Sequence, residues 1–322
     1  MKRRAFSTAA LGALAVTTLP FSRTAMAQGI ATLKLMIPAN PGGGWDQTGR
    51  ALAAAMQSAK VVQSVQFDNK GGAAGTIGPA QFVNAAKGDP NTMMMGGMVM
   101  VGGIVLNKSP VDLTMVTPIA RMTTEYEVIV VPANSPHKTI GDLVKAFKAD
   151  PGKVSWGGGS AGGTDHILVG LVAKATGADT IKINYVPFKG GGEAITGIIG
   201  GHVSAGVSGL GEFAEQIKAG RMRALAVSGP KAIDGIPSLK EQGIDVELGN
   251  WRGIFAAPGI TTAQRDSLIA AVKTATDSPM WKESLTKFGW DAAFIGGDDY
   301  KKFLDEDVKR ITVIIDSLGL RK

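Results

Sequence analysis

The chain has 322 residues, of which 44% are hydrophobic, and it contains no cysteine. The absence of thiols excludes disulfide staples, thiolate metal sites and a cysteine nucleophile. The histidines His137, His166 and His202 are too far apart for metal-ligand spacing, so we expect neither a metal nor a cofactor.

The first 27 residues have the pattern of a secretion signal. A short basic start and an apolar stretch at residues 9–21 precede Ala25-Met26-Ala27, a small-x-small cleavage site. The apolar stretch is shorter than the roughly 20 residues that span a bilayer. We expect cleavage after Ala27 and a periplasmic protein, and Arg3-Arg4 leaves both the general and the twin-arginine export routes open. The remaining chain has 30 Lys and Arg against 27 Asp and Glu, which is not the footprint of a nucleic-acid-binding protein.

Strand-like and helix-like segments alternate after the leader. Strands are predicted at residues 33–39, 61–67, 92–95, 127–131, 153–156, 183–188, 202–207, 223–227 and 254–257. Helices are predicted at residues 46–59, 77–86, 140–149, 164–176, 193–199, 212–219, 262–276, 280–288 and 298–318. This alternation is typical of an α/β protein with mainly parallel sheets flanked by helices.

The length of the chain favours two lobes with a ligand cleft between them, because a single sheet of this size would be unusual. We interpret the strands at 127–131 and 223–227 as the crossings between the lobes. Lobe one would then be discontinuous, at residues 28–126 and 228–322, and lobe two would comprise residues 127–227. The final helix would return to lobe one through an apolar stripe formed by Val308, Ile311, Ile315 and Leu318.

Four glycine-rich turns follow predicted strands and lead into helices. They lie at residues 40–46, 69–75, 157–164 and 189–192. A helix N-terminus has unpaired N–H groups and a dipole that favours an anion, and glycine lets a ligand approach the backbone. Because strands of an α/β sheet end at a common edge, these turns predict an anion site there. Simple connection of elements is the alternative for each turn.

Several residues near the turns have two possible roles. Asp46 is placed to cap the helix that it opens, a role that we favour over ligand contact. Trp45 could close over a ligand or pack in the core. Trp251 could line the hinge, and Arg252 is the best candidate for a cationic contact from that side, whereas we expect His166 to lie on a helix surface or to donate a hydrogen bond.

The third turn also fits two catalytic patterns. Its glycines at 157, 159 and 162 match a dinucleotide fingerprint, but no acidic residue follows at the end of a second strand. Gly158-Gly159-Ser160-Ala161-Gly162 matches the nucleophile elbow of α/β hydrolases, although no histidine lies in the last third of the chain. A secreted serine hydrolase using Ser160 is therefore the alternative function, and a secreted adhesion protein without a ligand is another. We expect no catalytic residue.

Motifs along the whole exported chain resemble those of the substrate-binding proteins of tripartite tricarboxylate transporters, the Bug receptors. The resemblance is carried by residues 41–50 (Pro-Gly-Gly-Gly-Trp-Asp-Gln-Thr-Gly-Arg), 69–75, 160–166, 186–191 (Val-Pro-Phe-Lys-Gly-Gly), 200–203 (Gly-Gly-His-Val) and 251–259 (Trp-Arg-Gly-Ile-Phe-Ala-Ala-Pro-Gly). These motifs follow the order found in the family. Gly71 stands where the family usually has proline, and Ala74 stands where it has glycine.

The resemblance implies a periplasmic two-lobe binding protein that holds a carboxylate between the turns at 41–46 and 159–164. It also implies integral membrane subunits as partners, and we expect a monomer. Citrate or another tricarboxylate leads the ligands, followed by dicarboxylates and aromatic carboxylates. The turns and the resemblance together give the candidate ligand-binding residues Asn40, Gly43, Gly44, Trp45, Asp46, Ala73, Ser160, Gly162, Gly163, Thr164, Lys189 and Gly190.

Overall fold

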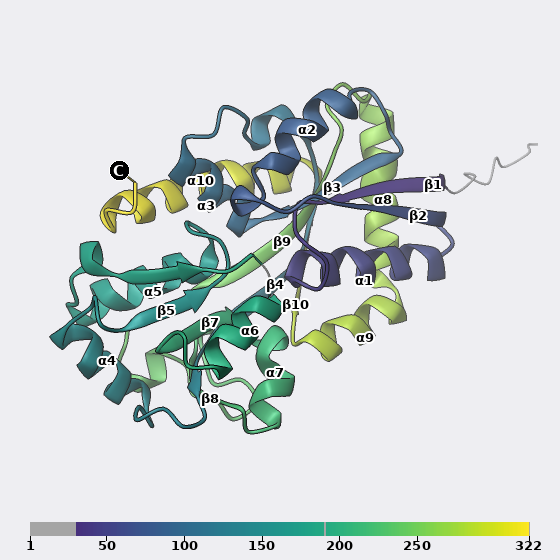
Figure 1. Cartoon of the computed structure of the whole chain (residues 1–322). Helices are drawn as coiled ribbons and strands as arrows, with labels where there is room; N and C mark the ends of the chain where they lie inside the picture. Colours follow the sequence, from purple (N-terminus) through teal and green to yellow (C-terminus); the bar gives the residue numbers. More distant parts are fainter. Residues whose placement is uncertain (1–29, 190, 322) are drawn as a thin grey trace, which may run out of the picture.

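The computed structural model of the protein describes residues 30–189 and 191–321 (Figure 1). The predicted leader and Gly190 therefore lie outside the described residues. The strands are β1 (Ile30–Ile37), β2 (Val62–Asn69), β3 (Thr92–Gly97), β4 (Thr117–Pro132), β5 (Ser155–Gly158), β6 (Asn184–Pro187), β7 (Ala205–Gly209), β8 (Met222–Val227), β9 (Gly249–Ala256) and β10 (Asp291–Gly296). The α-helices are α1 (Gly44–Ser58), α2 (Ile77–Ala85), α3 (Met98–Asn107), α4 (Ile140–Ala149), α5 (Thr164–Thr176), α6 (Gly191–Ile199), α7 (Leu210–Lys218), α8 (Thr262–Asp277), α9 (Pro279–Phe288) and α10 (Gly297–Ser317). Short 3₁₀ turns lie at Ala73–Gly75, Leu113–Met115, Thr180–Lys182 and Lys240–Gln242.

Strand β4 connects the two halves of the molecule. The strand order is β2-β1-β3-β9-β4-β7-β5-β6, with β8 and β10 also paired to β4. The first part of β4 pairs with β9 as far as Tyr126, which lies opposite Gly249. From Glu127, which lies opposite Gly209, the strand pairs with β7 instead. The partner strand thus changes between residues 126 and 127, where we placed the outward crossing.

The α/β class is confirmed, with a difference in the central strands. The β1–β2, β1–β3, β5–β6 and β5–β7 pairs are parallel, as predicted. The pairs of β4 with β7, β8, β9 and β10 are antiparallel, and so is the β3–β9 pair. Strand β9 lies beside β4 in Figure 1 and carries the chain back to the first half, so the two strands run in opposite directions.

The return from the second half is longer than the predicted crossing. After β8, the segment 228–248 stays beside that strand, where Val227 donates a backbone hydrogen bond to Pro237 and Leu239 donates one to Val227. Ile233 and Ile236 pack against buried residues of the second half. Strand β9 then begins at Gly249. The lobe limits at 126/127 and 227/228 stay predictions.

Sequence analysis did not predict α3, β10 or the first ten residues of β4. Helix α3 is apolar all round and contains Gly102 and Gly103, so it has neither a helical period nor good propensity. These glycines serve close packing, because a Cβ on Gly102 would collide with the Gly162 carbonyl oxygen of the third turn. The first part of β4 was not predicted because the polar residues Thr123, Thr124 and Glu125 interrupt the apolar pattern expected of a buried strand.

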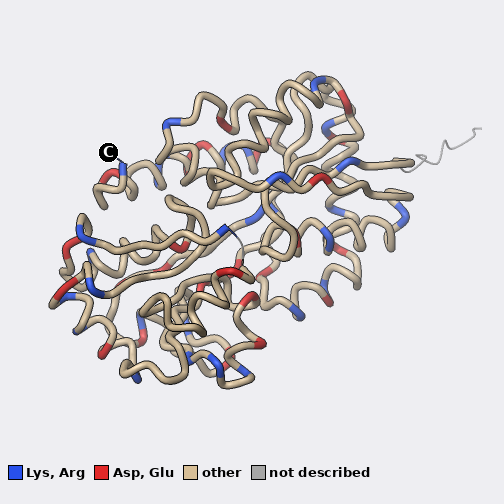
Figure 2. Tube along the Cα trace, viewed as in Figure 1, with Lys and Arg blue, Asp and Glu red and all other residues tan. Residues whose placement is uncertain are grey.

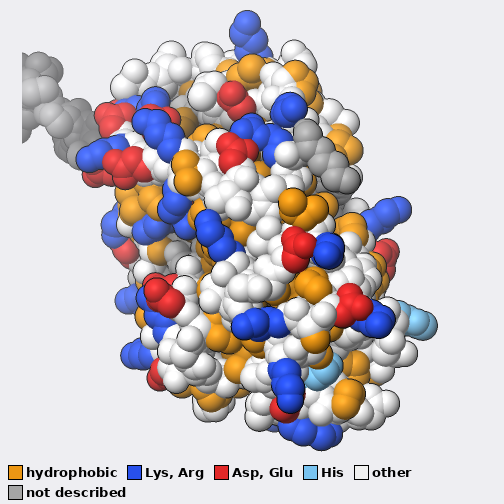
Figure 3. All heavy atoms as spheres, turned by 90° about the vertical axis from the view of Figure 1, so that its left-hand side faces the viewer, with side chains coloured by type: hydrophobic (Ala, Val, Ile, Leu, Met, Phe, Trp, Pro, Cys, Tyr) orange, Lys and Arg blue, Asp and Glu red, His pale blue; other side chains and the backbone are white. Residues whose placement is uncertain are grey.

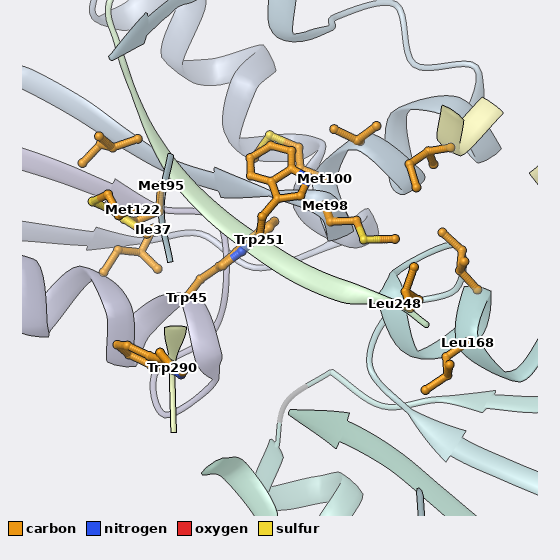
Figure 4. Packing of buried hydrophobic residues seen from close by; sticks show 14 of the residues in the cluster. Ile37, Trp45, Met95, Met98, Met100, Met122, Leu168, Leu248, Trp251 and Trp290 are labelled. Atoms are coloured by element: carbon orange, nitrogen blue, oxygen red, sulfur yellow. The ribbon is translucent and has the colours of Figure 1, made fainter. Parts of the chain in front are cut away.

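A hydrophobic core runs through both halves beneath the helices. It includes residues of β1 and β3 in the first half and of β5 and α5 in the second. Figure 4 shows part of this cluster, with Trp45, Trp251 and Trp290 among its labelled members. A second, smaller cluster lies between β4, β8, α6 and α7, around Phe213 and Ile198. Burial on this scale, at about 25 cal/mol per Å² of apolar surface, is the main term that stabilises both halves.

Helix α10 packs along the first half, as predicted from its apolar stripe. Ile311, Ile315 and Leu318 are fully buried, whereas Val308 is 36% exposed. The end of the helix also reaches the second half, where Leu318 lies so close to Gly170 of α5 that a Cβ there would be 2.5 Å from Leu318 Cδ1. No helix of the described residues is long and apolar enough to cross a membrane. On the face drawn in Figure 3, positive and negative side chains are interspersed.

Candidate functional site

A cleft with charged walls lies where the two halves meet, and all four glycine-rich turns contribute to it. It encloses about 840 Å³, part of which is open to solvent. Its wall includes Gly43 and Gly44 from the first turn, Gly71 and Gly72 from the second, Ser160 and Thr164 from the third, and Lys189 from the fourth. A space of this size suits a small organic ligand. The predicted convergence of the turns is present, although they do not share one sheet edge: they follow two sets of strands that run in opposite directions, β1 and β2 in one half and β5 and β6 in the other.

Four helices begin at this cleft. The residues that begin them or precede them line its wall: Gly43 and Gly44 for α1, Gly163 and Thr164 for α5, Gly191 for α6, and Gly209 for α7. The N–H groups of a first helical turn have no partner inside the helix, and the dipole adds partial positive charge there. The cleft therefore offers several positions for an anion.

The first turn combines an anion-facing backbone with a structural carboxylate. Asp46 accepts hydrogen bonds from the Gly42 N–H at 3.0 Å, from Arg50 Nε at 2.9 Å and from Asn69 Nδ2 at 3.0 Å. Although burial opposes it, this set of donors lowers the pKa of Asp46. The side chain fixes the turn and does not line the cleft. Trp45 lines the cleft but is 7% exposed, so it also packs in the core.

The third turn places a buried hydroxyl in the cleft wall. Thr164 is the first residue of α5 and is fully buried, and its Oγ1 has no hydrogen-bond partner among the described residues. Ser160 also lines the cleft, and its carbonyl accepts a hydrogen bond from the Gly163 N–H at 2.9 Å. A buried hydroxyl without a partner is costly, so a ligand atom that paired with Thr164 would recover that cost.

Not every predicted residue lines the cleft. The predicted residues that line it are Gly43, Gly44, Trp45, Ser160, Gly163, Thr164 and Lys189. Asn40, Asp46, Ala73 and Gly162 are outside its lining. Asn40 lies on the exposed side of the first turn, and Gly162, with φ of +79°, packs against α3. Ala74 and Gly75, the neighbours of Ala73, line the wall instead.

His166 stabilises the third turn and is not placed to act as a general base for Ser160. Its Nδ1 accepts a hydrogen bond from the Gly162 N–H at 3.1 Å, and its ring stacks on Tyr185 at 4.2 Å between centroids. Burial lowers the pKa of His166 to about 4. A ring nitrogen that already accepts a backbone hydrogen bond is not free to accept the Ser160 proton, so the arrangement does not favour a hydrolase.

Arg252 is bound by the protein's own groups. It forms an ion pair with Glu125, and its Nη1 donates to Thr48 Oγ1 at 2.9 Å. Its Nη2 is 3.7 Å from Glu212 Oε1, and its guanidinium lies over the Trp290 ring at 5.3 Å. The side chain is 2% exposed and lines the cleft. Trp251 does not line it, because its Nε1 donates to Asp307 within the core.

Sequence analysis missed three carboxyl groups in the cleft wall: Glu127, Asp165 and Glu212. Burial raises the pKa of Asp165 to about 6 and that of Glu212 to about 7, and neighbouring carboxylates add to both shifts. Burial raises the pKa of Glu127 well above its ordinary value. Figure 2 shows acidic positions close to the junction of the halves. A signal existed in Glu125-x-Glu127, since alternate residues of a strand share one face.

Glu212 reaches from α7 to the ends of two other helices. A Cβ on Gly44 would lie 2.7 Å from Glu212 Oε1, and a Cβ on Gly191 would lie 3.1 Å from Oε2. The carboxyl group therefore lies beside the N-termini of both α1 and α6. Glycine at residue 44 allows this approach, because a Cβ there would also lie against the Arg252 guanidinium.

Within residues 30–189 and 191–321, no group of three or more His, Cys, Asp or Glu side chains is arranged to hold a metal ion. The cleft thus combines N–H groups at the starts of four helices with carboxyl groups from β4, α5 and α7.

Comparisons with known sequences agree on one family. A model described as "Tripartite tricarboxylate transporter family receptor" matches residues 49–320. A Cupriavidus necator protein named "UPF0065 protein in gbd 5'region" is 31% identical over 327 residues, covering 99% of this chain and 97% of its own.

Solved structures agree on the fold. The periplasmic binding protein BugD has a TM-score of 0.82 at 22% identity, covering 91% of this chain and 99% of its own. Rpa4515 of R. palustris, solved with adipate, has a TM-score of 0.81 at 22% identity, with 90% and 97% covered. The two-lobe α/β fold predicted from the sequence is confirmed.

Proposed function

Because this chain belongs to the tripartite tricarboxylate transporter receptor family, we propose that it captures a small organic carboxylate in the cleft and delivers it to the integral membrane subunits of such a transporter. A receptor role needs no catalytic residue, in agreement with the hydrogen bond that already engages His166. The proposal includes export to the periplasm after cleavage at Ala27 and function as a monomer.

One observation carries the proposal: the first and third turns both present helix N-termini to the same cleft. A carboxylate has two oxygens that can each accept more than one hydrogen bond. The first-turn N–H groups of α1 and α5, with the Thr164 hydroxyl beside them, supply donors of that kind from both sides of the cleft. The ligand would thereby connect the two halves.

The proposal also concerns which carboxylate the cleft binds. Citrate was the first expectation from the sequence, and it stays an untested prediction. The adipate bound to the related fold makes dicarboxylates equal candidates here. The carboxyl groups of Glu127, Asp165 and Glu212 disfavour a ligand with three ionised carboxylates, because like charges in a buried cleft repel strongly.

A thermal-shift screen of the exported protein against organic acids tests the proposal, with calorimetric titration of each hit. We expect at least one mono-, di- or tricarboxylate to raise the melting temperature and to bind with one-to-one stoichiometry. If no acid in a broad set binds, the receptor function is wrong for this cleft. Ester hydrolysis that is lost in Ser160→Ala would instead favour the hydrolase.

A further inference from the structure

The carboxyl-rich side of the cleft repels a carboxylate when its acids are ionised, and it points to a second chemical group on the ligand. We propose that Glu127, Asp165 and Asn250 form a subsite for a protonated amino group, so that the preferred ligand is an amino acid or a related carboxylate bearing an ammonium. This inference rests on the proposed receptor function and names the ligand class within it.

The register of the sheet brings the subsite together. Glu125 and Glu127 lie two residues apart on β4 and so face the same side of the sheet. Asn250 of β9 lies opposite Glu125 and donates from Nδ2 to Glu125 Oε1 at 3.1 Å. Asp165 enters from the first turn of α5, and its Oδ2 accepts the Gly159 N–H at 2.6 Å. Three separate elements thus contribute to one wall.

The atoms that lack partners in this wall are mostly acceptors. Neither oxygen of Glu127, which is 0% exposed, accepts a hydrogen bond from a described donor, and its only available pairing is a proton shared with the Asp165 carboxyl. The Asn250 side-chain oxygen, in a residue 6% exposed, has no donor within the described part of the chain either. Since Nδ2 of Asn250 is fixed by Glu125, the amide cannot turn its N–H group to the cleft. An ammonium has three N–H donors and no acceptor, which matches these three oxygens.

The charge balance favours a cation over a second anion. Among the described residues that line the cleft, Glu127, Asp165 and Glu212 face two basic side chains, Arg252 and Lys189. Arg252 is already paired with Glu125, and Lys189 is exposed at the rim. Buried carboxylates without a cation are strongly unfavourable, so a ligand ammonium would supply the missing charge. The N–H groups at the starts of α1 and α5 would hold the ligand carboxylate.

The same groups can recognise a plain carboxylate only in a different protonation state. The carboxyl groups of Glu127, Asp165 and Glu212 would have to be protonated to donate hydrogen bonds to it. Burial raises the pKa of all three groups and so favours that state, which Asp165 and Glu212 lose as the pH rises through their pKa values of about 6 and about 7. The two ligand classes therefore differ in their pH dependence. The groups that act on this equilibrium are Glu125, Glu127, Asp165, Tyr185, Glu212 and Arg252.

The experiment is calorimetric titration of the exported protein with pairs of acids that differ only in an amino group: succinate and aspartate, glutarate and glutamate, adipate and 2-aminoadipate. We expect at least one amino-bearing member to bind at least tenfold more tightly than its plain partner at pH 7.5. Its affinity should rise between pH 5.5 and 8 as the carboxyl groups ionise. The Glu127→Gln variant should lose the preference by weakening the amino-bearing member at least tenfold. Glu215→Gln, which removes an exposed carboxylate from α7, should keep it.

The outcomes separate this inference from the receptor function. If plain acids bind as tightly as their amino-bearing partners in every pair, the ammonium subsite is wrong while the carboxylate receptor stands. The same holds if Glu127→Gln leaves the preference unchanged. If no member of any pair binds, and citrate also does not, both ideas fail together. Should Glu127→Gln not fold, the pH dependence of the parent protein decides, because plain acids would bind more weakly as the pH rises.

Discussion

Replacing Thr164 by valine should weaken ligand binding without weakening the fold. The hydroxyl is fully buried at the start of α5, lines the cleft and has no partner among the described residues. A hydrogen bond to a charged group contributes about 1.5–3 kcal/mol. At about 1.4 kcal/mol per decade, its loss should weaken carboxylate binding roughly tenfold to a hundredfold. Valine has nearly the same shape, so the cavity that alanine would leave is avoided.

The effect of Thr164→Val on stability should have the opposite sign. A buried hydroxyl without a partner costs about 1–3 kcal/mol of desolvation, so removing it should leave the free energy of unfolding unchanged or raise it by about 1 kcal/mol. Thr262→Val is the matched control, because Thr262 is the first residue of α8 but is exposed and outside the cleft. Calorimetric titration and urea denaturation measure both quantities. Unchanged affinity together with a loss of more than about 1 kcal/mol of stability would show that the hydroxyl serves the fold alone.

Four further outcomes follow from the site and the fold. Gly43→Ala should weaken ligand binding by blocking the backbone but leave the melting temperature unchanged, because φ there is −82° and a Cβ would meet only the Asn40 carbonyl at 3.9 Å. Gly44→Ala should also destabilise the protein, since its Cβ would lie 2.7 Å from Glu212 Oε1. Equal melting temperatures for the two variants would contradict this difference. Folding raises the pKa of Glu212 from 4.5 to about 7, so this group's contribution to stability is present below about pH 4.5 and is lost as the pH rises through 7. Because His166, with its pKa lowered to about 4, contributes the opposite slope, the test compares Glu212→Gln with the parent protein in thermal denaturation: the variant should lose less stability, or gain more, between pH 5 and 7.5, and parallel profiles would refute the assignment. Small-angle scattering should give a smaller radius of gyration with bound ligand than without, because two halves joined at β4 and β9 should close on it. Mass spectrometry of the exported protein should find Gln28 as the first residue, and a chain that retains residues 1–27 would rule out the cleavage site.

The sequence predicted most of the framework because its signals are local. Helix α5 begins at Thr164 and ends at Thr176 as expected, since a glycine turn and an apolar period define it. Helix α4 likewise has a capping box at Thr139 and Asp142. The four turns meet at one cleft because the carboxyl ends of β1 and β2 in one half face those of β5 and β6 in the other, and ligands bind at such strand ends.

What the sequence did not predict depends on contacts between distant segments. Helix α3 lacks a period because it is buried on several sides, against the third turn and α10. The carboxyl-rich wall was not predicted either, because Glu127, Asp165 and Glu212 are separated by about 40 residues each along the chain. They are brought together by the β4–β7 pairing and by the positions of α5 and α7. Arg252, considered as a ligand contact, turned out to be paired with Glu125, which lies far away in sequence.

The central claim is that helix N-termini of both halves hold a ligand carboxylate, and a crystal structure with the tightest-binding acid tests it most directly. We expect carboxylate oxygens within about 2.7–3.2 Å of backbone nitrogens in the first turns of α1 and α5, with Thr164 Oγ1 at a similar distance. Any amino group should lie beside Glu127 and Asn250. A ligand bound outside the cleft, or with its carboxylate against Glu127 and Asp165 and no contact to either turn, would contradict the account.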